Sequence, residues 1–313
     1  MPELTVLLAE PRGSCAGVER AIEIVRAALR KYGAPVYVRH AIVHNQTVVG
    51  GLIAEGAVFV EDLAEVPKDR PVVLSAHGVP KSVIEDAENR NLIYVDAACP
   101  LVVKVHGEVR HLHDQGFEIA LIGHAGHQEV IGTLGQLPEG IIHLVEDEAG
   151  AETFVPRQTE RLAYVMQTTL SVDEAGRIEA VLKRRFPNIR GPRTEDICYA
   201  TTNRQKAVKK MVSLGAQIIF VVGSPASSNS KRLVEVAREA GCQAELTPKA
   251  HDIPWHMLRS PELKTIGVTA GASAPESDVR EVVGYLGGYF ATTVLSVKVA
   301  EERHKFNLPP GLR

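Results

Sequence analysis

The chain has 313 residues, about twice the length of a typical domain, so we expect two or three compact units with ample cores. Hydrophobic residues make up 45% of the chain and charged residues 23%, and no apolar run approaches the roughly 18 residues that a membrane span needs. The 35 Lys and Arg residues against 38 Asp and Glu residues leave a net charge of -3, which argues against nucleic-acid binding and favours small-molecule partners.

The first residues, MPELTVLLAEPRG, lack the basic segment and uninterrupted apolar run of a signal peptide, so we predict a cytoplasmic protein. From there, short apolar runs alternate with segments of helical periodicity. The predicted strands are 5–9, 35–38, 71–76, 93–97, 119–123, 162–167, 217–223 and 265–271. The predicted helices are 17–33, 101–115, 129–136, 173–186, 203–214, 229–240 and 276–286. This alternation is typical of an α/β protein with mainly parallel sheets.

The chain shows a three-part organisation in the spacing of its cysteines. Cys15, Cys99 and Cys198 are 84 and 99 residues apart, and each stands near the junction between a strand or loop and a helix. This spacing predicts three small α/β units, 1–98, 99–197 and 198–313, the last with a C-terminal tail. Each unit would contribute one thiol to a common centre.

Small, polar or histidine-bearing loops follow five of the predicted strands. They are HGVP at 77–80, HAGHQE at 124–129, TTLS at 168–171, SPASSNS at 224–230 and ASAP at 272–275. In open α/β sheets, ligands bind at the carboxyl ends of the strands, where backbone N–H groups and helix N-termini point at them. The glycines, hydroxyls and amide of these loops suit phosphate oxygens. The alternative for any one loop is ordinary helix capping by Ser or Asn.

Histidines and one acid add to this set of polar loops. The histidines in or near these loops are His44, His77, His124 and His127. As cations or hydrogen-bond donors they would supply positive charge. The alternative is that each is structural, as a lone histidine more often is. Glu129 follows two residues after His127 at a helix start, and Thr168 stands at another strand end. A carboxylic acid beside a hydroxyl and an imidazole forms a proton relay if the fold brings them together. The alternative for Glu129 is a favourable interaction with the helix dipole.

The cysteines are either buried small hydrophobes, catalytic thiols or metal ligands, because the cytosol keeps thiols reduced and no C-x-x-C pair is present. Cys15, Cys99 and Cys198 lie beside small residues, proline or a helix start, a setting that stabilises a thiolate and suits metal ligation. Cys242 lacks that setting, and we expect it to be structural. Three thiolates are one short of the usual complement of a 4Fe-4S cluster, which would leave one iron open.

Nine motifs in a fixed order carry a resemblance that covers nearly the whole chain. They are GSCAGVERAI, VHNQTVV, SAHGV, ACPLV, GHAGHQEVIGTLGQ, QTTLSVDE, ICYATTNRQ, GSPASSNSKRL and GVTAGASAPE. With them the chain resembles the 4-hydroxy-3-methylbut-2-enyl diphosphate reductases of the non-mevalonate isoprenoid pathway. The resemblance implies a trefoil of three α/β units around a central 4Fe-4S cluster held by Cys15, Cys99 and Cys198.

The same resemblance assigns roles to the polar residues. It implies that the diphosphate is held by His44, His77, His127, Ser227, Ser228, Asn229 and Ser273. Thr168 and Glu129 would lie beside the hydroxymethyl end of the substrate and act in catalysis together with His127. The chain departs from the family where Gln128 replaces the usual proline before Glu129 and Ala98 replaces a common threonine. The loss of proline makes the backbone that orients Glu129 less rigid.

The reaction that the resemblance implies is reductive removal of an allylic hydroxyl, giving isopentenyl and dimethylallyl diphosphate. It needs a Lewis acid on oxygen, a proton so that water leaves, and two electrons delivered one at a time, which an open iron, Glu129 and the cluster would supply. No convincing G-x-G-x-x-G follows a strand, so the electrons must come from an external carrier of the ferredoxin or flavodoxin type.

Two other classes of protein share parts of this pattern. A cluster protein that senses oxygen or iron and binds a phosphorylated signal needs the cysteines and the polar loops but not Glu129. A zinc hydrolase acting on a phosphorylated substrate would use the same three thiolates. Metal and sulfide analysis of anaerobically purified protein separates these alternatives.

Overall fold

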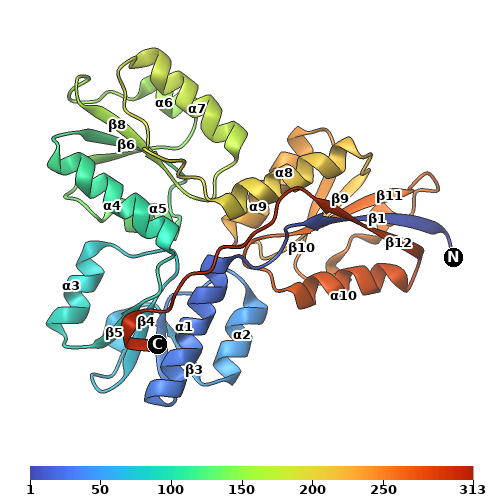
Figure 1. Ribbon diagram of the computed structural model, residues 1–313, viewed down its shortest axis with the longest axis horizontal. Helices are drawn as coiled ribbons and strands as arrows, with labels where there is room; N and C mark the ends of the chain where they lie inside the picture. Colours follow the sequence, from blue (N-terminus) through green and yellow to red (C-terminus); the bar gives the residue numbers. More distant parts are fainter. Residues whose placement is uncertain (313) are drawn as a thin grey trace. The chain divides into compact units, whose positions relative to one another are not determined.

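The computed structural model of the chain describes residues 1–312 and contains three parallel sheets within them (Figure 1). The chain divides into two compact units. Unit 1 consists of residues 1–16, 44–48 and 199–304, and unit 2 consists of residues 17–43, 49–198 and those from 305 onward. Unit 1 holds one sheet and unit 2 holds two, so the predicted α/β class with three parallel sheets is confirmed.

The sheet of unit 1 has five parallel strands in the order β10-β9-β11-β1-β12. The strands are β1 (Glu3–Glu10), β9 (Ile218–Val222), β10 (Gln243–Thr247), β11 (Thr265–Ala270) and β12 (Ala291–Lys298). Helices α8 (Tyr199–Ser213) and α9 (Ser228–Glu239) cover one face, and α10 (Glu276–Gly287) covers the other (Figure 1). Because both faces are covered, the central strands are continuous apolar runs; all five residues of β9 are buried.

Unit 2 contains a four-stranded sheet in the order β3-β2-β4-β5. Its strands are β2 (Val36–Arg39), β3 (Ala57–Val60), β4 (Pro71–Leu74) and β5 (Ile93–Asp96). The helices along this part of the chain are α1 (Ala16–Tyr32), α2 (Gln46–Ala54) and α3 (Lys81–Asn89). In α1 the apolar residues fall on one face, and Gly33 follows with a φ of 73°, a left-handed conformation that ends the helix.

The second sheet of unit 2 has three strands in the order β7-β6-β8. They are β6 (Glu118–Ile122), β7 (Ile142–Val145) and β8 (Leu162–Met166). The accompanying helices are α4 (Pro100–Asp114), α5 (Gln128–Leu134), α6 (Glu148–Thr153) and α7 (Val172–Arg185). Apolar side chains of α7 and of α4 pack on this sheet in two separate clusters, so both of its faces are covered.

Every predicted strand and helix is present, with ends that differ by a few residues at most. Four further strands, β3, β7, β10 and β12, were not predicted, and each of them lies at the edge of its sheet. An edge strand has one side open to solvent, so it carries more polar residues and a weaker apolar signal. Strand β12, ATTVLSVK, is the clearest case, because Val297 is its one buried residue.

Strand β1 pairs with β11 on one side and with β12 on the other. Residues from the beginning of the predicted unit 1–98 therefore contribute to the sheet that contains most of the predicted unit 198–313. The sequence ELTVLLAE fits this central position because it alternates little and buries side chains on both faces of the sheet. The boundaries near residues 98 and 197 stay predictions.

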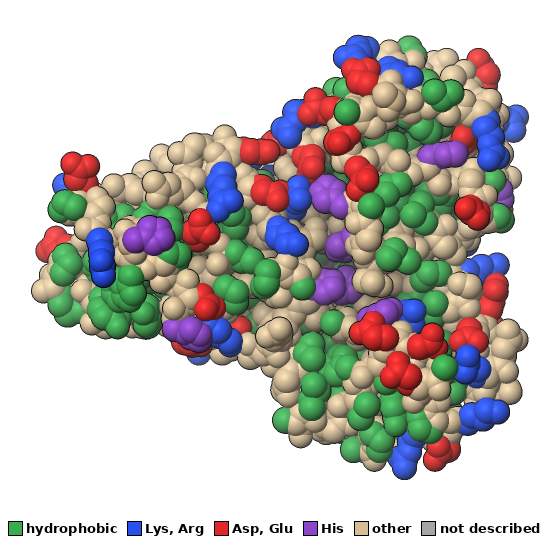
Figure 2. Space-filling model, turned by 180° about the vertical axis from the view of Figure 1, so that it is seen from behind, with side chains coloured by type: hydrophobic (Ala, Val, Ile, Leu, Met, Phe, Trp, Pro, Cys, Tyr) green, Lys and Arg blue, Asp and Glu red, His purple; other side chains and the backbone are tan. Residues whose placement is uncertain are grey.

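None of the helices formed by residues 1–312 combines the length and the apolar character needed to cross a lipid bilayer. Acidic and basic side chains are intermixed over the face of the molecule in Figure 2, without a large region of one sign. This agrees with the net charge of -3.

Candidate functional site

Three of the four cysteines stand at the amino-terminal ends of helices. Cys15 directly precedes α1, Cys99 is the N-cap residue of α4, and Cys198 directly precedes α8. None of the three forms a disulfide, and all three are of intermediate burial. The partial positive charge of a helix N-terminus stabilises a thiolate, so each of these side chains is in a setting that suits ligation of a soft metal.

Cys242 lies in a different environment. It is buried at the start of β10, and its thiol donates to the carbonyl of Ala216 at 3.1 Å. Burial raises the pKa of the Cys242 thiol, which keeps it protonated. These contacts agree with the expected structural role of this residue.

Backbone hydrogen bonds fix two of the thiol-bearing turns within unit 2. The Cys99 amide donates to the carbonyl of Ala76 at 2.8 Å, and the Cys198 amide donates to the carbonyl of Thr168 at 3.0 Å. The Arg20 guanidinium donates to the carbonyl of Ala98 at 3.1 Å. Burial lowers the pKa of Arg20, and the nearby charges of Asp96 and Cys99 oppose that shift. Sequence analysis did not single out Arg20, which places a positive charge beside the Cys99 turn.

In unit 1 a buried arginine holds the turn that carries Cys15. Arg204 is 0% exposed, donates from Nη2 to the carbonyl of Gly13 at 2.6 Å, and pairs with Glu302 at 3.0 Å. Gly13 has a φ of 67°, and a Cβ there would lie 3.0 Å from the Ala274 carbonyl oxygen, so glycine is required. The Cys15 amide donates to the carbonyl of Ala272 at 3.1 Å. Arg204 was also missed by sequence analysis.

The donor set fits a thiolate-bound group. Within residues 1–312, no three His, Cys, Asp or Glu side chains are grouped closely enough to hold a single metal ion. The three helix-terminal cysteines instead offer soft sulfur ligands, which select iron-sulfur clusters, zinc or copper over hard cations such as magnesium. Small residues flank Cys15 and Cys99, as in SCAG and AACP, whereas Cys198 stands between Ile197 and Tyr199.

Glu129 and Thr168 form a buried pair in unit 2. Glu129, the second residue of α5, is 3% exposed. Its Oε1 accepts from the amide of Thr168 at 2.6 Å, and its Oε2 lies 3.1 Å from Thr168 Oγ1. Burial raises the pKa of Glu129 to about 7; the two hydrogen bonds from Thr168 oppose this and the charge of Asp196 adds to it. The fold therefore brings the acid and the hydroxyl together, which is the condition for a proton relay.

His127 contacts this pair, and His77 in turn contacts His127. The rings of His77 and His127 meet edge to face with centroids 5.9 Å apart. Ser75 Oγ lies 2.8 Å from His77 Nδ1 and thereby orients that imidazole. His127 is the N-cap residue of α5, and its Nδ1 accepts from the Glu129 amide at 3.2 Å. Nδ1 is therefore an acceptor, which leaves the proton of a neutral ring on Nε2.

The polar loops of unit 1 form a second cluster. Ser227 is the N-cap residue of α9 and accepts from the Ser230 amide at 3.3 Å, so it does cap a helix as the alternative predicted. Asn229 accepts from the Ala272 amide at 2.8 Å and donates to Thr201 Oγ1 at 3.1 Å.

Ser273 and His44 belong to the same cluster. Ser273 Oγ donates to the carbonyl of His44 at 3.2 Å. Burial, followed by the charge of Lys231, lowers the pKa of His44, so its ring is mostly neutral at neutral pH. Ser228, the first residue of α9, is half-buried.

Two glycines allow the strand ends of unit 1 to approach this cluster. A Cβ on Gly223, after β9, would lie 2.2 Å from Ser230 Oγ, and one on Gly271, after β11, would lie 2.0 Å from the same atom. The first turn of α9 therefore packs directly on two strand ends, and any larger side chain would push it away.

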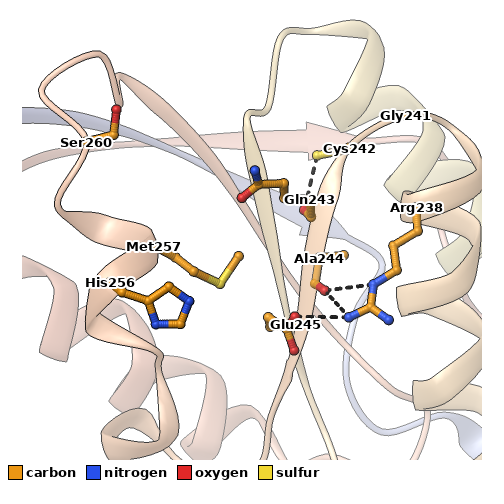
Figure 3. A pocket seen from close by; sticks show the side chains of 9 residues that line it. All are labelled: Arg238, Gly241, Cys242, Gln243, Ala244, Glu245, His256, Met257 and Ser260. Atoms are coloured by element: carbon orange, nitrogen blue, oxygen red, sulfur yellow. Dashed lines mark hydrogen bonds and ion pairs between the residues drawn. The ribbon is translucent and has the colours of Figure 1, made fainter.

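A cavity of about 770 Å³ in unit 1 lies apart from these polar clusters, beside edge strand β10 (Figure 3). Its lining includes Cys242, Glu245, His256 and Met257. Arg238 turns its guanidinium to the Ala244 carbonyl at 2.8 Å and to Glu245 at 3.0 Å, so its charge is already paired. Cys242 is the only predicted residue in its lining, and we do not assign this cavity to the site.

The structure thus brings the predicted residues together in two groups. Unit 2 contains the hydrogen-bonded pair of Glu129 and Thr168 and the ring contact of His77 with His127. Unit 1 contains the cluster of His44, Ser227, Ser228, Asn229 and Ser273.

Comparisons with known proteins extend over almost the entire chain. The model of the family described as LytB protein matches residues 6–287. A 4-hydroxy-3-methylbut-2-enyl diphosphate reductase from Cereibacter sphaeroides is 56% identical over 317 residues, which cover 100% of this chain and 98% of that protein.

Two solved structures are similar to this one. The E-1-hydroxy-2-methyl-but-2-enyl-4-diphosphate reductase of Plasmodium falciparum is 38% identical with a TM-score of 0.95, covering 99% of this chain and 97% of that one. A structure of (E)-4-hydroxy-3-methyl-but-2-enyl diphosphate reductase, described as the terminal enzyme of the non-mevalonate pathway, is 27% identical with a TM-score of 0.62. That similarity covers 91% of this chain and 99% of that one.

Proposed function

The chain belongs to the LytB family, and from this premise we propose that it is a reductase that removes the hydroxyl group of 4-hydroxy-3-methylbut-2-enyl diphosphate. The products would be isopentenyl and dimethylallyl diphosphate. One arrangement carries the proposal: the buried Glu129 carboxyl is hydrogen-bonded to the Thr168 hydroxyl, its amide donates to His127, and burial raises its pKa to about 7. Such a group is a proton donor at neutral pH.

We propose that Cys15, Cys99 and Cys198 hold a 4Fe-4S cluster. The support is their position at three helix N-termini, where each side chain is half-buried. When bound, such a cluster supplies electrons one at a time and a Lewis-acidic iron for the substrate's hydroxyl oxygen. Arg20, which donates to the residue before Cys99, would stabilise the negative charge of that thiolate.

The diphosphate would be bound by neutral donors and imidazoles. The amide of Asn229 and the hydroxyl groups of Ser227 and Ser273 are buried and oriented by hydrogen bonds within unit 1. The N-terminus of α9 adds its partial positive charge, which favours an anion. The complete set that we propose for the diphosphate is His44, His77, His127, Ser227, Ser228, Asn229 and Ser273.

Glu129 would deliver the proton that turns the leaving hydroxyl into water. With a pKa of about 7, its carboxyl group is about half protonated at neutral pH. The Thr168 hydroxyl donates to Glu129 Oε2 at 3.1 Å. Once the carboxyl is protonated, it would donate to Thr168 Oγ1 instead, and the threonine hydroxyl would pass its own proton to the substrate. In the whole reaction one carbon–oxygen bond breaks, two electrons and two protons are taken up, and water leaves.

His127 would act with this pair. Its Nδ1 is engaged by the Glu129 amide, so Nε2 carries the proton of the neutral ring and can donate to an anionic oxygen. The same contact caps the first turn of α5 and helps to hold the Glu129 backbone in place.

The electrons would come from a separate protein of the ferredoxin or flavodoxin type. We propose a cytoplasmic location, where reducing conditions keep cysteines out of disulfide bonds.

Anaerobic turnover tests the proposal. The protein is purified without oxygen, analysed for iron, sulfide and zinc, and mixed with 4-hydroxy-3-methylbut-2-enyl diphosphate and a strong artificial one-electron reductant. We expect iron and sulfide in near-equal amounts and formation of both products. Zinc without iron or sulfide would support a hydrolase instead, and an iron-sulfur protein without turnover would support a sensor.

A further inference from the structure

Three segments of unit 2 meet at a junction that includes none of the residues proposed to touch substrate or cluster. They are the loop 78–80 after β4, helix α4, and the end of helix α5 with the turn after it. Each segment carries a proposed site residue at its other end: His77 directly precedes the loop, Cys99 caps α4, and Glu129 lies in the first turn of α5. The geometry of this junction therefore sets the spacing of all three.

One buried side chain, Gln136, ties the three segments together. Its Nε2 donates to the carbonyl of Val79 in the loop and to the carbonyl of Gly132 in α5, both at 2.9 Å. Its Oε1 accepts from Arg110 Nη1 of α4 at 2.6 Å. Both amide hydrogens and the carbonyl of this side chain are thus engaged, each with a different segment.

The backbones at the junction are in direct contact. A Cβ on Gly132 would lie 3.2 Å from the Gly78 carbonyl and 3.3 Å from the Val79 amide nitrogen. A Cβ on Gly135 would lie 2.4 Å from Pro80 Cβ, and the Lys81 amide donates to the Gly135 carbonyl at 2.9 Å. Gly132 therefore lies directly against the loop backbone, and Gly135 lies against the Pro80 ring, so a small shift of the helix end or of the loop moves the other.

Helix α4 closes the other side of the loop. A Cβ on Gly78 would lie 2.6 Å from His106 Cε1, so the imidazole packs on the glycine backbone. Burial, and then the charge of Arg110, lower the pKa of His106 to about 4, which keeps the ring neutral. The loop 78–80 is therefore held between the neutral imidazole of His106 in α4 and Gly132 of α5.

We propose that Gln136 is a positioning residue, which keeps His77 in register with His127 and Glu129 through its bonds to Val79 and Gly132. Val79 is two residues from His77, and Gly132 is three residues from Glu129. The edge-to-face contact of His77 with His127, at 5.9 Å, is the result of that register. This inference rests on the proposed function, because it assigns the spacing of these histidines to binding of the diphosphate.

The test compares variants at the junction with a matched glutamine elsewhere. Gln136→Leu removes all three hydrogen bonds. Gln136→Glu keeps the shape and the contact with Arg110 but loses the two amide donors, and Arg110→Met removes only the third contact. Gln217→Leu is the control, since Gln217 also makes three bonds, to Glu262, Lys264 and Thr265, but in unit 1.

We expect Gln136→Leu and Gln136→Glu to raise KM about fivefold to tenfold, with kcat changed less, and to weaken binding of inorganic pyrophosphate, measured by calorimetry, by a similar factor. Arg110→Met and Gln217→Leu should stay within about twofold, and iron content should be unchanged in all four. Equal KM and pyrophosphate affinity for Gln136→Glu and the parent would overturn the inference. Absence of turnover in the parent protein would instead count against the proposed function, while pyrophosphate binding would still decide the role of Gln136.

Discussion

The polar loops of unit 1 and unit 2 occupy the same kind of position, the carboxyl ends of parallel strands, but they carry different chemistry. In unit 1, Ser227, Asn229 and Ser273 are neutral groups whose hydrogen bonds run to the surrounding backbone and to a threonine. In unit 2, Glu129 is an acid with a pKa of about 7, bonded to a single threonine. The serine and asparagine groups of unit 1 stay neutral over the whole physiological pH range. The carboxyl group of Glu129 changes its charge within that range.

This difference indicates a division of tasks. Neutral, pre-oriented donors lose little conformational entropy when an anion binds, so they are suited to holding the diphosphate. A buried acid that titrates near neutral pH is suited to giving up a proton during the reaction. The thiols do not follow this division, because Cys15 belongs to unit 1 and Cys99 and Cys198 belong to unit 2. Cluster binding by the thiols is thus a third task, which variants can separate from diphosphate binding and proton delivery.

The largest effect should come from the thiols. We expect Cys15→Ser, Cys99→Ser and Cys198→Ser each to lose nearly all bound iron and sulfide, and Cys242→Ser to keep them, because the Cys242 thiol is buried and bonded to Ala216. Iron and sulfide assays on anaerobically prepared variants measure this. Normal iron content in any of the first three variants would show that its cysteine is not a ligand.

Glu129→Gln should come next in size. The amide keeps the shape of the side chain but has no acidic proton to give, so kcat should fall by a factor of about 100 to 10,000. Thr168→Val should show a smaller loss, since it removes the relay hydroxyl and leaves the acid. Product formation with an artificial reductant gives both rates. A variant rate close to that of the parent would mean that the proton comes from another group, such as His127.

The buried acid should also make stability depend on pH. The pKa of Glu129 rises from an ordinary 4.5 to about 7 on folding, so the folded protein binds this proton more tightly than the unfolded chain. Its contribution to the free energy of unfolding is therefore fully present below pH 4.5 and is lost as the pH rises through 7. Denaturant titrations of parent and Glu129→Gln at several pH values isolate this contribution, which is on the order of 3 kcal/mol at most. Parallel pH curves for the two proteins would contradict the raised pKa.

The smallest effects should come from single donors of unit 1. Asn229→Ala and Ser273→Ala should each weaken substrate binding by roughly 1 kcal/mol, about fivefold in KM, with kcat and iron content little changed. Steady-state kinetics of both variants provide the measurement. Unchanged KM values would show that the loops carrying Asn229 and Ser273 have a structural role only and do not bind the substrate.

Local sequence patterns were enough to predict the parallel α/β fold and the central strands. The apolar runs of β9 and β11 are continuous because helices cover both faces of their sheet. Strands β3, β7, β10 and β12 escaped prediction because an edge strand is partly open to solvent and carries a mixed sequence.

A residue could be singled out from the sequence where its own neighbours mark it as a candidate, and not where only distant contacts do. Glu129 and Thr168 were marked by a helix start and a strand end. Arg204, which holds Gly13 across 191 residues, and Gln136, which holds Val79 across 57, lie within helices or turns with no local signal of their partners.

The most direct test of the division of tasks is the affinity of Glu129→Gln for the substrate, measured by calorimetry on the anaerobically prepared protein beside Asn229→Ala. The structure predicts that Glu129→Gln binds 4-hydroxy-3-methylbut-2-enyl diphosphate within about twofold of the parent while forming almost no product, and that Asn229→Ala binds about fivefold more weakly while still turning over. If Glu129→Gln loses binding and turnover together, the acid holds the substrate instead of delivering its proton, and the account is contradicted.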